Sequence, residues 1–145
     1  MFERILLSVD GSEDAGRALR ATRELARIHG SEVLVVHGRE AGRLAPPVPS
    51  CPVPPRHLSL ETEDEARRLL SAAVSELRDG QLRVRGQLLP RQGRVAQQIV
   101  EAARVARSDL IVLGSRGMSL MWELVAGGPA EKVIRLADRP VLIVR

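Results

Sequence analysis

The sequence predicts an α/β fold, in which one domain holds a mostly parallel sheet covered by helices on both faces. Short apolar runs rich in β-branched residues alternate with longer stretches whose apolar residues recur at helical spacing. A strand is followed by a helix four times before a last strand ends the pattern. This alternation is typical of parallel sheets, and 145 residues fit one domain, spanning residues 1–145.

The first strand is expected over residues 4–9, an apolar run that stops at Asp10 and Gly11. Ser12 is a good N-cap for a helix over residues 13 to about 29, because its side chain can accept a hydrogen bond from a free amide of the first turn. Gly30 ends that helix. A second buried strand follows over residues 32–37.

Residues 38–60 form a proline-rich loop within the domain, since six prolines in this segment exclude regular structure. A loop of this length is either a lid over a site or a plain surface connection. Helical spacing returns over residues 60–78, and Gly80 marks its end. Four acidic residues are expected in the first turn of this helix, where the dipole favours them: Glu61, Glu63, Asp64 and Glu65.

The third strand, over residues 81–89, alternates polar and apolar side chains, which predicts an edge strand whose wet face is guarded by Arg83 and Arg85. Gly93 introduces a third helix, and residues 109–113 form a fourth strand. A short helix begins at Pro129 and runs to Ala137. Residues 139–144 form the last strand.

The last strand is apolar on both faces, which leaves two interpretations. An exposed edge of this kind invites pairing with a second copy of the chain, whereas an inner strand would bury the same residues. We favour a homodimer whose contact is made by Val141, Leu142, Ile143 and Val144.

Composition narrows the classes of protein. The net charge is +4, but the arginines are spread along the chain and only Phe2 and Trp122 are aromatic, which argues against nucleic-acid binding. No apolar run reaches the ~20 residues of a membrane span. The single cysteine, Cys51, excludes an intrachain disulfide. These features are typical of a cytoplasmic protein without a membrane partner.

Two segments that directly follow strands would form a ligand site if those two strands are neighbours in the sheet. Asp10 follows the first strand, and Gly114-Ser115-Arg116-Gly117 follows the fourth. In an open parallel sheet, ligands bind at the carboxyl ends of the strands. An aspartate there can accept hydrogen bonds from ribose or adenine, and glycines let backbone amides approach phosphates.

A second glycine pair, Gly127 and Gly128, precedes the helix that begins at Pro129. The free amides of a helix N-terminus favour an anion. The segment is not a P-loop, because Ser119 stands where the second glycine of that motif is required. Ordinary turns explain two isolated glycines equally well, so the nucleotide site is predicted from the combination with Asp10.

Taken together, these residues resemble the universal stress protein family. The similarity lies in residues 4–12, 33–37, 109–117 and 130–144, so it covers the chain apart from the proline-rich loop. It implies a five-stranded sheet of order 3-2-1-4-5, the fold called adenine nucleotide alpha hydrolase-like. It also implies dimerisation through the last strand.

The ATP-binding branch of that family carries the pattern G-x2-G-x9-G-[ST]. Gly114, Gly117 and Gly127 match it, but Gly128 replaces the hydroxyl residue. Losing that hydroxyl costs about 1.5–3 kcal/mol, so binding is weakened rather than abolished. The nucleotide-binding residues implied by the resemblance are Val9, Asp10, Gly38, Leu113, Gly114, Arg116, Gly117, Gly127, Gly128 and Pro129.

The expected function is a small stress-response or signalling protein that binds ATP, or AMP or ADP, as a regulatory ligand and acts on a protein partner that the sequence does not name. Magnesium could accompany the nucleotide, and no residue set is suited to efficient phosphoryl transfer, so any hydrolysis should be slow. The alternatives are a dimeric interaction module without a nucleotide and a slow ATPase. His37, at the end of a buried strand, is expected to be structural.

Overall fold

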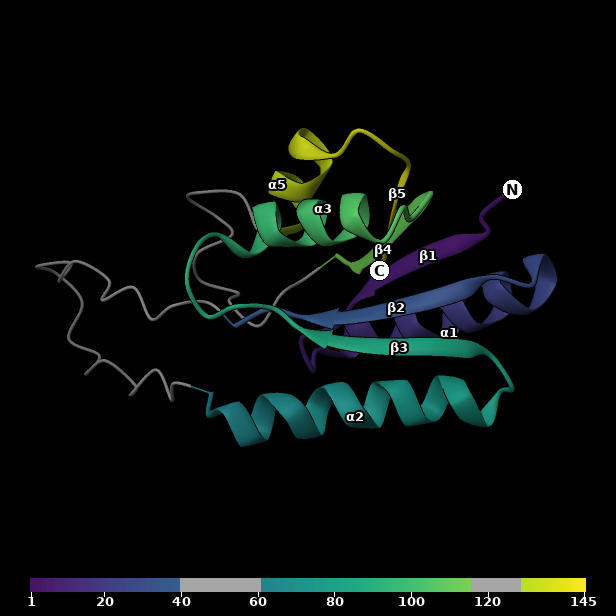
Figure 1. Ribbon diagram of the computed structural model, residues 1–145, viewed down its shortest axis with the longest axis horizontal. Coiled ribbons are helices and arrows are strands. Elements are labelled where there is room, and N and C mark those ends of the chain that lie inside the picture. The colour runs from purple at the N-terminus through teal and green to yellow at the C-terminus, as the bar shows by residue number, and fades with distance from the viewer. Residues whose placement is uncertain (40–60, 116–128) are drawn as a thin grey trace, which may run out of the picture.

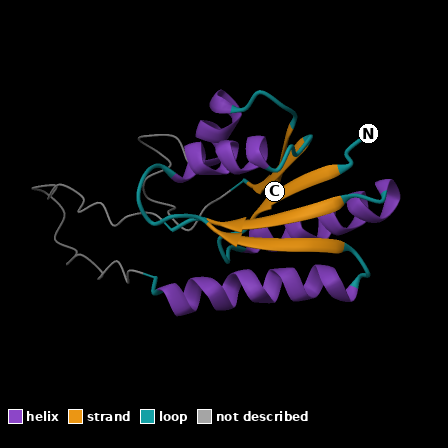
Figure 2. Ribbon diagram, in the orientation of Figure 1, coloured by secondary structure: helices purple, strands orange, loops and turns teal. Residues whose placement is uncertain are grey.

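The computed structural model describes residues 1–39, 61–115 and 129–145. Five parallel strands form one sheet in the order β3-β2-β1-β4-β5, which confirms the predicted topology. Figure 1 shows the sheet with its helices, and Figure 2 shows the same view by secondary structure. The strands are β1 (Arg4–Ser8), β2 (Glu32–His37), β3 (Arg83–Leu88), β4 (Leu110–Gly114) and β5 (Val141–Val144).

Two helices cover each face of the sheet in the described part of the chain. Helices α1 and α2 contribute buried residues to one apolar cluster, and α3 and α5 contribute to the other. The two pairs lie on opposite sides of the strands (Figure 1). The helices are α1 (Glu13–His29), α2 (Glu63–Asp79), α3 (Val95–Val105) and α5 (Pro129–Leu136).

Helix α1 begins and ends where the sequence predicts. The Ser12 hydroxyl accepts a hydrogen bond from the Ala15 amide at 3.1 Å, and Gly30 adopts a left-handed conformation with φ of 66°. A residue with a Cβ resists that conformation, so glycine ends the helix at little cost. Helix α2 begins with a capping box in which Thr62 and Glu65 satisfy each other's backbone amides.

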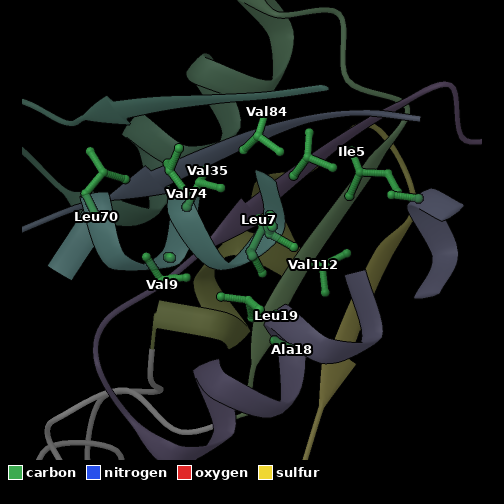
Figure 3. Close-up of a cluster of buried hydrophobic side chains, with 14 of the residues drawn as sticks. Ile5, Leu7, Val9, Ala18, Leu19, Val35, Leu70, Val74, Val84 and Val112 are labelled. Atoms are coloured by element: carbon green, nitrogen blue, oxygen red, sulfur yellow. The ribbon is translucent and has the colours of Figure 1, made fainter. Parts of the chain in front are cut away.

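The core is built from alternating strand residues because successive side chains point to opposite faces of a sheet. Ile5, Leu7 and Val9 face α1 and α2, where they pack with Leu19 and Val74 (Figure 3). Leu6 points to the opposite face of the sheet and packs under α3 and α5 instead. That second cluster is closed by Val36, Ile99, Ile111 and Val133, each no more than 1% exposed.

The two edge strands of the sheet are the ones predicted from the sequence. β3 is one edge of the sheet, as its alternating charge predicted, and β5 is the other edge rather than an inner strand. The side chains of β5 are half-buried. Most of the proline-rich loop, with Cys51, and the spacer that holds Trp122 lie outside the described residues. No helix in the described ranges is long and apolar enough to cross a membrane.

One detail of α2 differs from the prediction. Glu61 was expected in the first turn of the helix with the other acidic residues. It lies before the N-cap Thr62 instead, and its carboxylate contacts His37 on β2. A tertiary contact to a buried imidazole therefore accounts for Glu61, whereas the helix dipole accounts for Glu63 and Glu65.

Candidate functional site

The carboxyl ends of β2, β1, β4 and β5 meet along one edge of the sheet. Leu7 on β1 pairs with Val112 on β4, so Val9 and Gly114 are level two residues further on. Gly114 in turn pairs with Val144 on β5, and the Val9 amide donates to the carbonyl of Val36 on β2. The two segments singled out in the sequence thus follow adjacent strands, as a crevice at this edge requires.

Asp10 lies at this edge directly after β1 and is half-buried. Its Oδ1 accepts a hydrogen bond from the Ser12 amide at 2.9 Å, an Asx turn that leads the chain into α1. Its Oδ2 forms no hydrogen bond to any described residue. One carboxylate oxygen therefore fixes the turn, and the other has no partner among the described residues.

Gly114 lies against the first turn of α1. A Cβ at this position would come within 2.7 Å of both the Ala15 nitrogen and the Asp14 carbonyl carbon, which are backbone atoms that cannot rotate away. Glycine is therefore required here by helix packing as well as by any ligand. The next amide, of Ser115, donates to the Val144 carbonyl at 2.8 Å and is not available to a phosphate.

Asp14 joins α1 to the end of β4, a contact that the sequence analysis did not identify. This carboxylate is buried, with 9% of the residue exposed. Its Oδ2 accepts a hydrogen bond from the Ser115 hydroxyl at 2.5 Å, and its Oδ1 accepts one from Arg17 at 2.5 Å. Because Asp14 and Ser115 are 101 residues apart, no local pattern in the sequence relates them.

His37 is structural, as predicted, and it ties three segments together. Its ring is 3% exposed; Nδ1 lies 2.7 Å from the Val9 carbonyl and Nε2 lies 2.8 Å from a Glu61 carboxylate oxygen. A carbonyl oxygen only accepts, so Nδ1 is the donor in the first bond. Glu61 is thereby held at the carboxyl edge, between Val9 and the start of α2.

Gly38 and Arg39 follow β2 at the same edge. A Cβ on Gly38 would lie 2.6 Å from Cγ1 of Val95, so packing against α3 also calls for glycine here. Arg39 was not identified from sequence. It is buried, its Nε has no hydrogen-bond partner, and its charge contributes to a lowered pKa of Glu63, for which the hydrogen bond from Arg67 is the largest cause.

The remaining predicted residues divide into two groups. Leu113 is buried in the cluster under α3 and α5, and Pro129 is the first residue of α5, where a missing amide does no harm. Four predicted ligand residues lie outside the described residues: Arg116, Gly117, Gly127 and Gly128. Within the described ranges, no cluster of histidine, cysteine or carboxylate side chains could hold a metal ion.

Comparison with known proteins identifies the fold and the family. The family model described as "Universal stress protein family" matches residues 1–145. A universal stress protein of Thermus aquaticus is 36% identical over 100% of both chains. The solved universal stress protein of Archaeoglobus fulgidus has a TM-score of 0.70 at 27% identity, covering 100% of this chain and 95% of that one.

A further solved structure is that of the universal stress protein from Archaeoglobus fulgidus in complex with dAMP. Its TM-score is 0.67 at 24% identity, and the match covers 100% of this chain and 98% of that one. At this identity the similarity is one of fold. This chain and that protein therefore share the same scaffold.

Proposed function

The chain belongs to the universal stress protein family, and on that premise we propose that it binds ATP or a related adenine nucleotide as a regulatory ligand. The proposed site is the carboxyl edge around Asp10 and Gly114. The nucleotide would order the neighbouring loops and change what the protein binds in the cytoplasm.

The single observation that carries the proposal is that Oδ2 of Asp10, where β1 and β4 meet, bonds to none of the described residues. Its Oδ1 is committed to the Ser12 amide, so the carboxylate is oriented before any ligand arrives. Preorganised acceptors of this kind bind ribose hydroxyls without an ordering cost. The dAMP complex of the Archaeoglobus fulgidus protein supports the choice of ligand class through the shared fold.

Arg39 is a second reason to expect that an anion binds at the carboxyl edge of the sheet. It is a buried side chain next to Gly38, and its Nε has no hydrogen-bond partner among residues 1–39, 61–115 and 129–145. Phosphate oxygens are well suited to pair with such a group. Any magnesium would arrive with the phosphates, because no cluster of described histidine, cysteine or carboxylate side chains could hold a metal ion by itself.

A rival function is a dimeric interaction module that holds no nucleotide, and two observations favour it. Packing on α1 already accounts for Gly114, and the Ser115 amide is occupied by Val144. Gly114 and the Ser115 amide therefore both have structural roles that require no bound phosphate. The two proposals differ in one measurable property, which is whether the purified protein binds ATP.

The test is calorimetric titration with ATP of the wild type and of Asp10→Asn. Asparagine keeps the oxygen that accepts from Ser12, so the turn survives, but the negative charge is lost. We expect ATP affinity to fall about tenfold, as one charged hydrogen bond is worth about 1.5 kcal/mol or more. The free energy of unfolding should change by less than about 0.5 kcal/mol.

Two further results decide between the proposals. Gly128→Ser restores the hydroxyl of the family pattern and should tighten ATP binding about tenfold. Absence of any heat with millimolar ATP, in both the wild type and Gly128→Ser, would establish the interaction module instead. Turnover with magnesium is expected to be slow, and rapid hydrolysis would assign an enzyme.

We also propose that β5 forms the dimer contact. The carbonyls of Pro140 and Val144 accept bonds from β4, so by alternation the backbone groups of Val141 and Ile143 point away from the sheet. Ile143→Pro removes one outward amide and leaves the bonds from Ile111 and Ser115 to β5 intact. Sedimentation should show the variant as a monomer, and a dimer of unchanged affinity would place the contact elsewhere.

A further inference from the structure

A groove lies at the opposite end of the sheet from the proposed nucleotide site. Its volume is about 430 Å³, within the range of small-molecule sites. It is lined by the starts of β1, β2 and β3 and by the chain between α3 and β4. The charged and polar side chains among its lining residues are Arg4, Glu32, Arg83, Arg85 and Ser108.

Strand register brings the arginines of the groove onto one face. Arg4 pairs with Glu32 and Glu32 pairs with Arg83, while Leu6, Leu34 and Arg85 form the next row. Alternation places these two rows on the side of α3 and α5, since Ile5, Val33 and Val84 face the other helices. Strands lie about 4.8 Å apart and rise about 3.3 Å per residue, so the backbone of Arg4 lies about 10 Å from that of Arg83 and about 12 Å from that of Arg85.

The charges in the groove are not balanced. Arg83 pairs with Glu32 at 2.9 Å and donates to the Gly30 carbonyl. Arg4 and Arg85 form no ion pair within residues 1–39, 61–115 and 129–145. The groove lining thus holds three guanidinium groups and one carboxylate, while the neighbouring Asp109 carboxylate is bonded to the backbone amides of Glu3 and Arg4. A bound anion would relieve the repulsion between the arginines.

Ser108 gives a second and independent indication of a ligand. The residue is 4% exposed, and its hydroxyl is buried without a hydrogen-bond partner. Its backbone is fully used, with the amide bonded to Ala103 and the carbonyl bonded to Arg139. A buried hydroxyl without a partner is costly. Ser108 lines the groove, so rotation of its hydroxyl toward a ligand oxygen would remove that cost.

Protection of the sheet edge explains only part of this arrangement. Arg83 and Arg85 guard the edge strand β3, as the sequence predicted. Arg4, however, belongs to β1 in the middle of the sheet, where no edge needs protection. Neither Arg4 nor the unpartnered hydroxyl of Ser108 has a role in guarding β3.

We propose that this groove binds a small phosphate-bearing anion, held by Arg4 and Arg85 and by the Ser108 hydroxyl over the aliphatic floor of Leu34 and Ala106. Guanidinium groups match phosphate oxygens in geometry and charge. The site is separate from the proposed nucleotide site, because it lies at the amino ends of the strands.

The test is titration of isotope-labelled protein with inorganic pyrophosphate at low salt, followed by amide NMR. We expect saturable shifts at Leu34, Arg85 and Ser108. Arg4→Gln and Arg85→Gln should each weaken binding about tenfold. Arg20→Gln on α1 removes the same charge from an exposed site on the other face and should leave the affinity within about twofold.

Ser108→Ala separates a ligand contact from a structural role. The variant should bind pyrophosphate several-fold more weakly, and its stability should be unchanged or raised because an unsatisfied hydroxyl is removed. Shifts confined to Asp10 and Gly114, or no saturation at millimolar pyrophosphate, would overturn the proposal. Citrate binding as tightly as pyrophosphate, or RNA affinity rising with oligomer length, would also overturn it.

Discussion

The two ends of the sheet differ in how their charged side chains are satisfied. At the carboxyl end, Asp14 is bonded to Ser115 and Arg17, and His37 is bonded to Val9 and Glu61. At the amino end, in the described part of the chain, Arg4 and Arg85 have no acidic partner. The charged side chains at the carboxyl end of the sheet are thus hydrogen-bonded to their neighbours, whereas two arginines at the amino end have no acidic partner among the described residues.

This difference separates two ways of making a binding site. The carboxyl end uses its polar groups to hold loops and helix termini in place, and the proposed ligand contact is the second carboxylate oxygen of Asp10. At the amino end, Asp109 holds the start of β1 and Arg139 holds the chain before β4. Arg4 and Arg85 nevertheless form no ion pair with any described residue. The first arrangement favours precise placement of one ligand group, and the second favours attraction of an anion.

The largest expected effect comes from breaking the close packing at the carboxyl end. Gly114→Val places a side chain against the backbone of Ala15 and Asp14, where a Cβ alone already falls within 2.7 Å. Helix α1 has to move away from β4, and we expect a loss of about 3 kcal/mol in the free energy of unfolding. Urea denaturation measures it.

Gly16→Ala is the matched control for that substitution. Gly16 lies within α1, and the nearest atom to a Cβ there is the Arg20 guanidinium nitrogen at 3.9 Å. Alanine should stabilise the helix by about 0.5–1 kcal/mol. If Gly114→Val were as stable as the wild type, the contact between α1 and the end of β4 would not be as tight as described.

A smaller effect is expected at the histidine that connects β1, β2 and Glu61. His37→Phe keeps a buried ring but removes both hydrogen bonds, which leaves the Val9 carbonyl and the Glu61 carboxylate without their donor. We expect a loss of about 2 kcal/mol. In a double-mutant cycle with Glu61→Ala, the two substitutions should couple by about 1 kcal/mol.

The control is the exposed His29, at the end of α1. His29→Phe should change the free energy of unfolding by less than about 0.5 kcal/mol. Strictly additive effects of His37→Phe and Glu61→Ala would show that the bond between them contributes nothing to stability. The carboxyl end would then be less connected than its geometry indicates.

The helices and strands could be predicted because the sequence of each one contains the signals that mark it, such as capping residues or alternating charge. Ser12 and Gly30 mark the ends of α1, and alternating charge marks β3 as an edge. The parallel sheet followed from the alternation of elements alone. The order of its strands came from the family resemblance, since nothing in the spacing fixes which strand lies beside β1.

The site was predictable only where its residues follow strands directly. Asp10 and Gly114 were found because carboxyl ends of parallel strands gather at one edge. Asp14 with Ser115, and His37 with Glu61, join positions distant in sequence, so only the folded chain relates them. The amino-end groove needs the register of three strands, which sequence periodicity does not supply.

The smallest effect concerns the capping box of α2, which begins beside Glu61. Hydrogen bonds from Thr62, first its backbone amide and then its hydroxyl, lower the pKa of the Glu65 carboxyl. Glu65 therefore stabilises the fold above the ordinary pKa of a glutamate, and this contribution is lost as the pH falls through the lowered value. Acid should weaken α2 through this pair.

Thr62→Ala should lower the free energy of unfolding by about 1 kcal/mol at neutral pH, because the N-cap is lost. The deficit should shrink as the medium is acidified and Glu65 is protonated in both proteins. Thr62→Ser retains the hydroxyl and should follow the wild type across the pH range. A deficit that grew on acidification would mean that Glu65 is not stabilised as a carboxylate, and that this helix start does not share the satisfied charges of the carboxyl end.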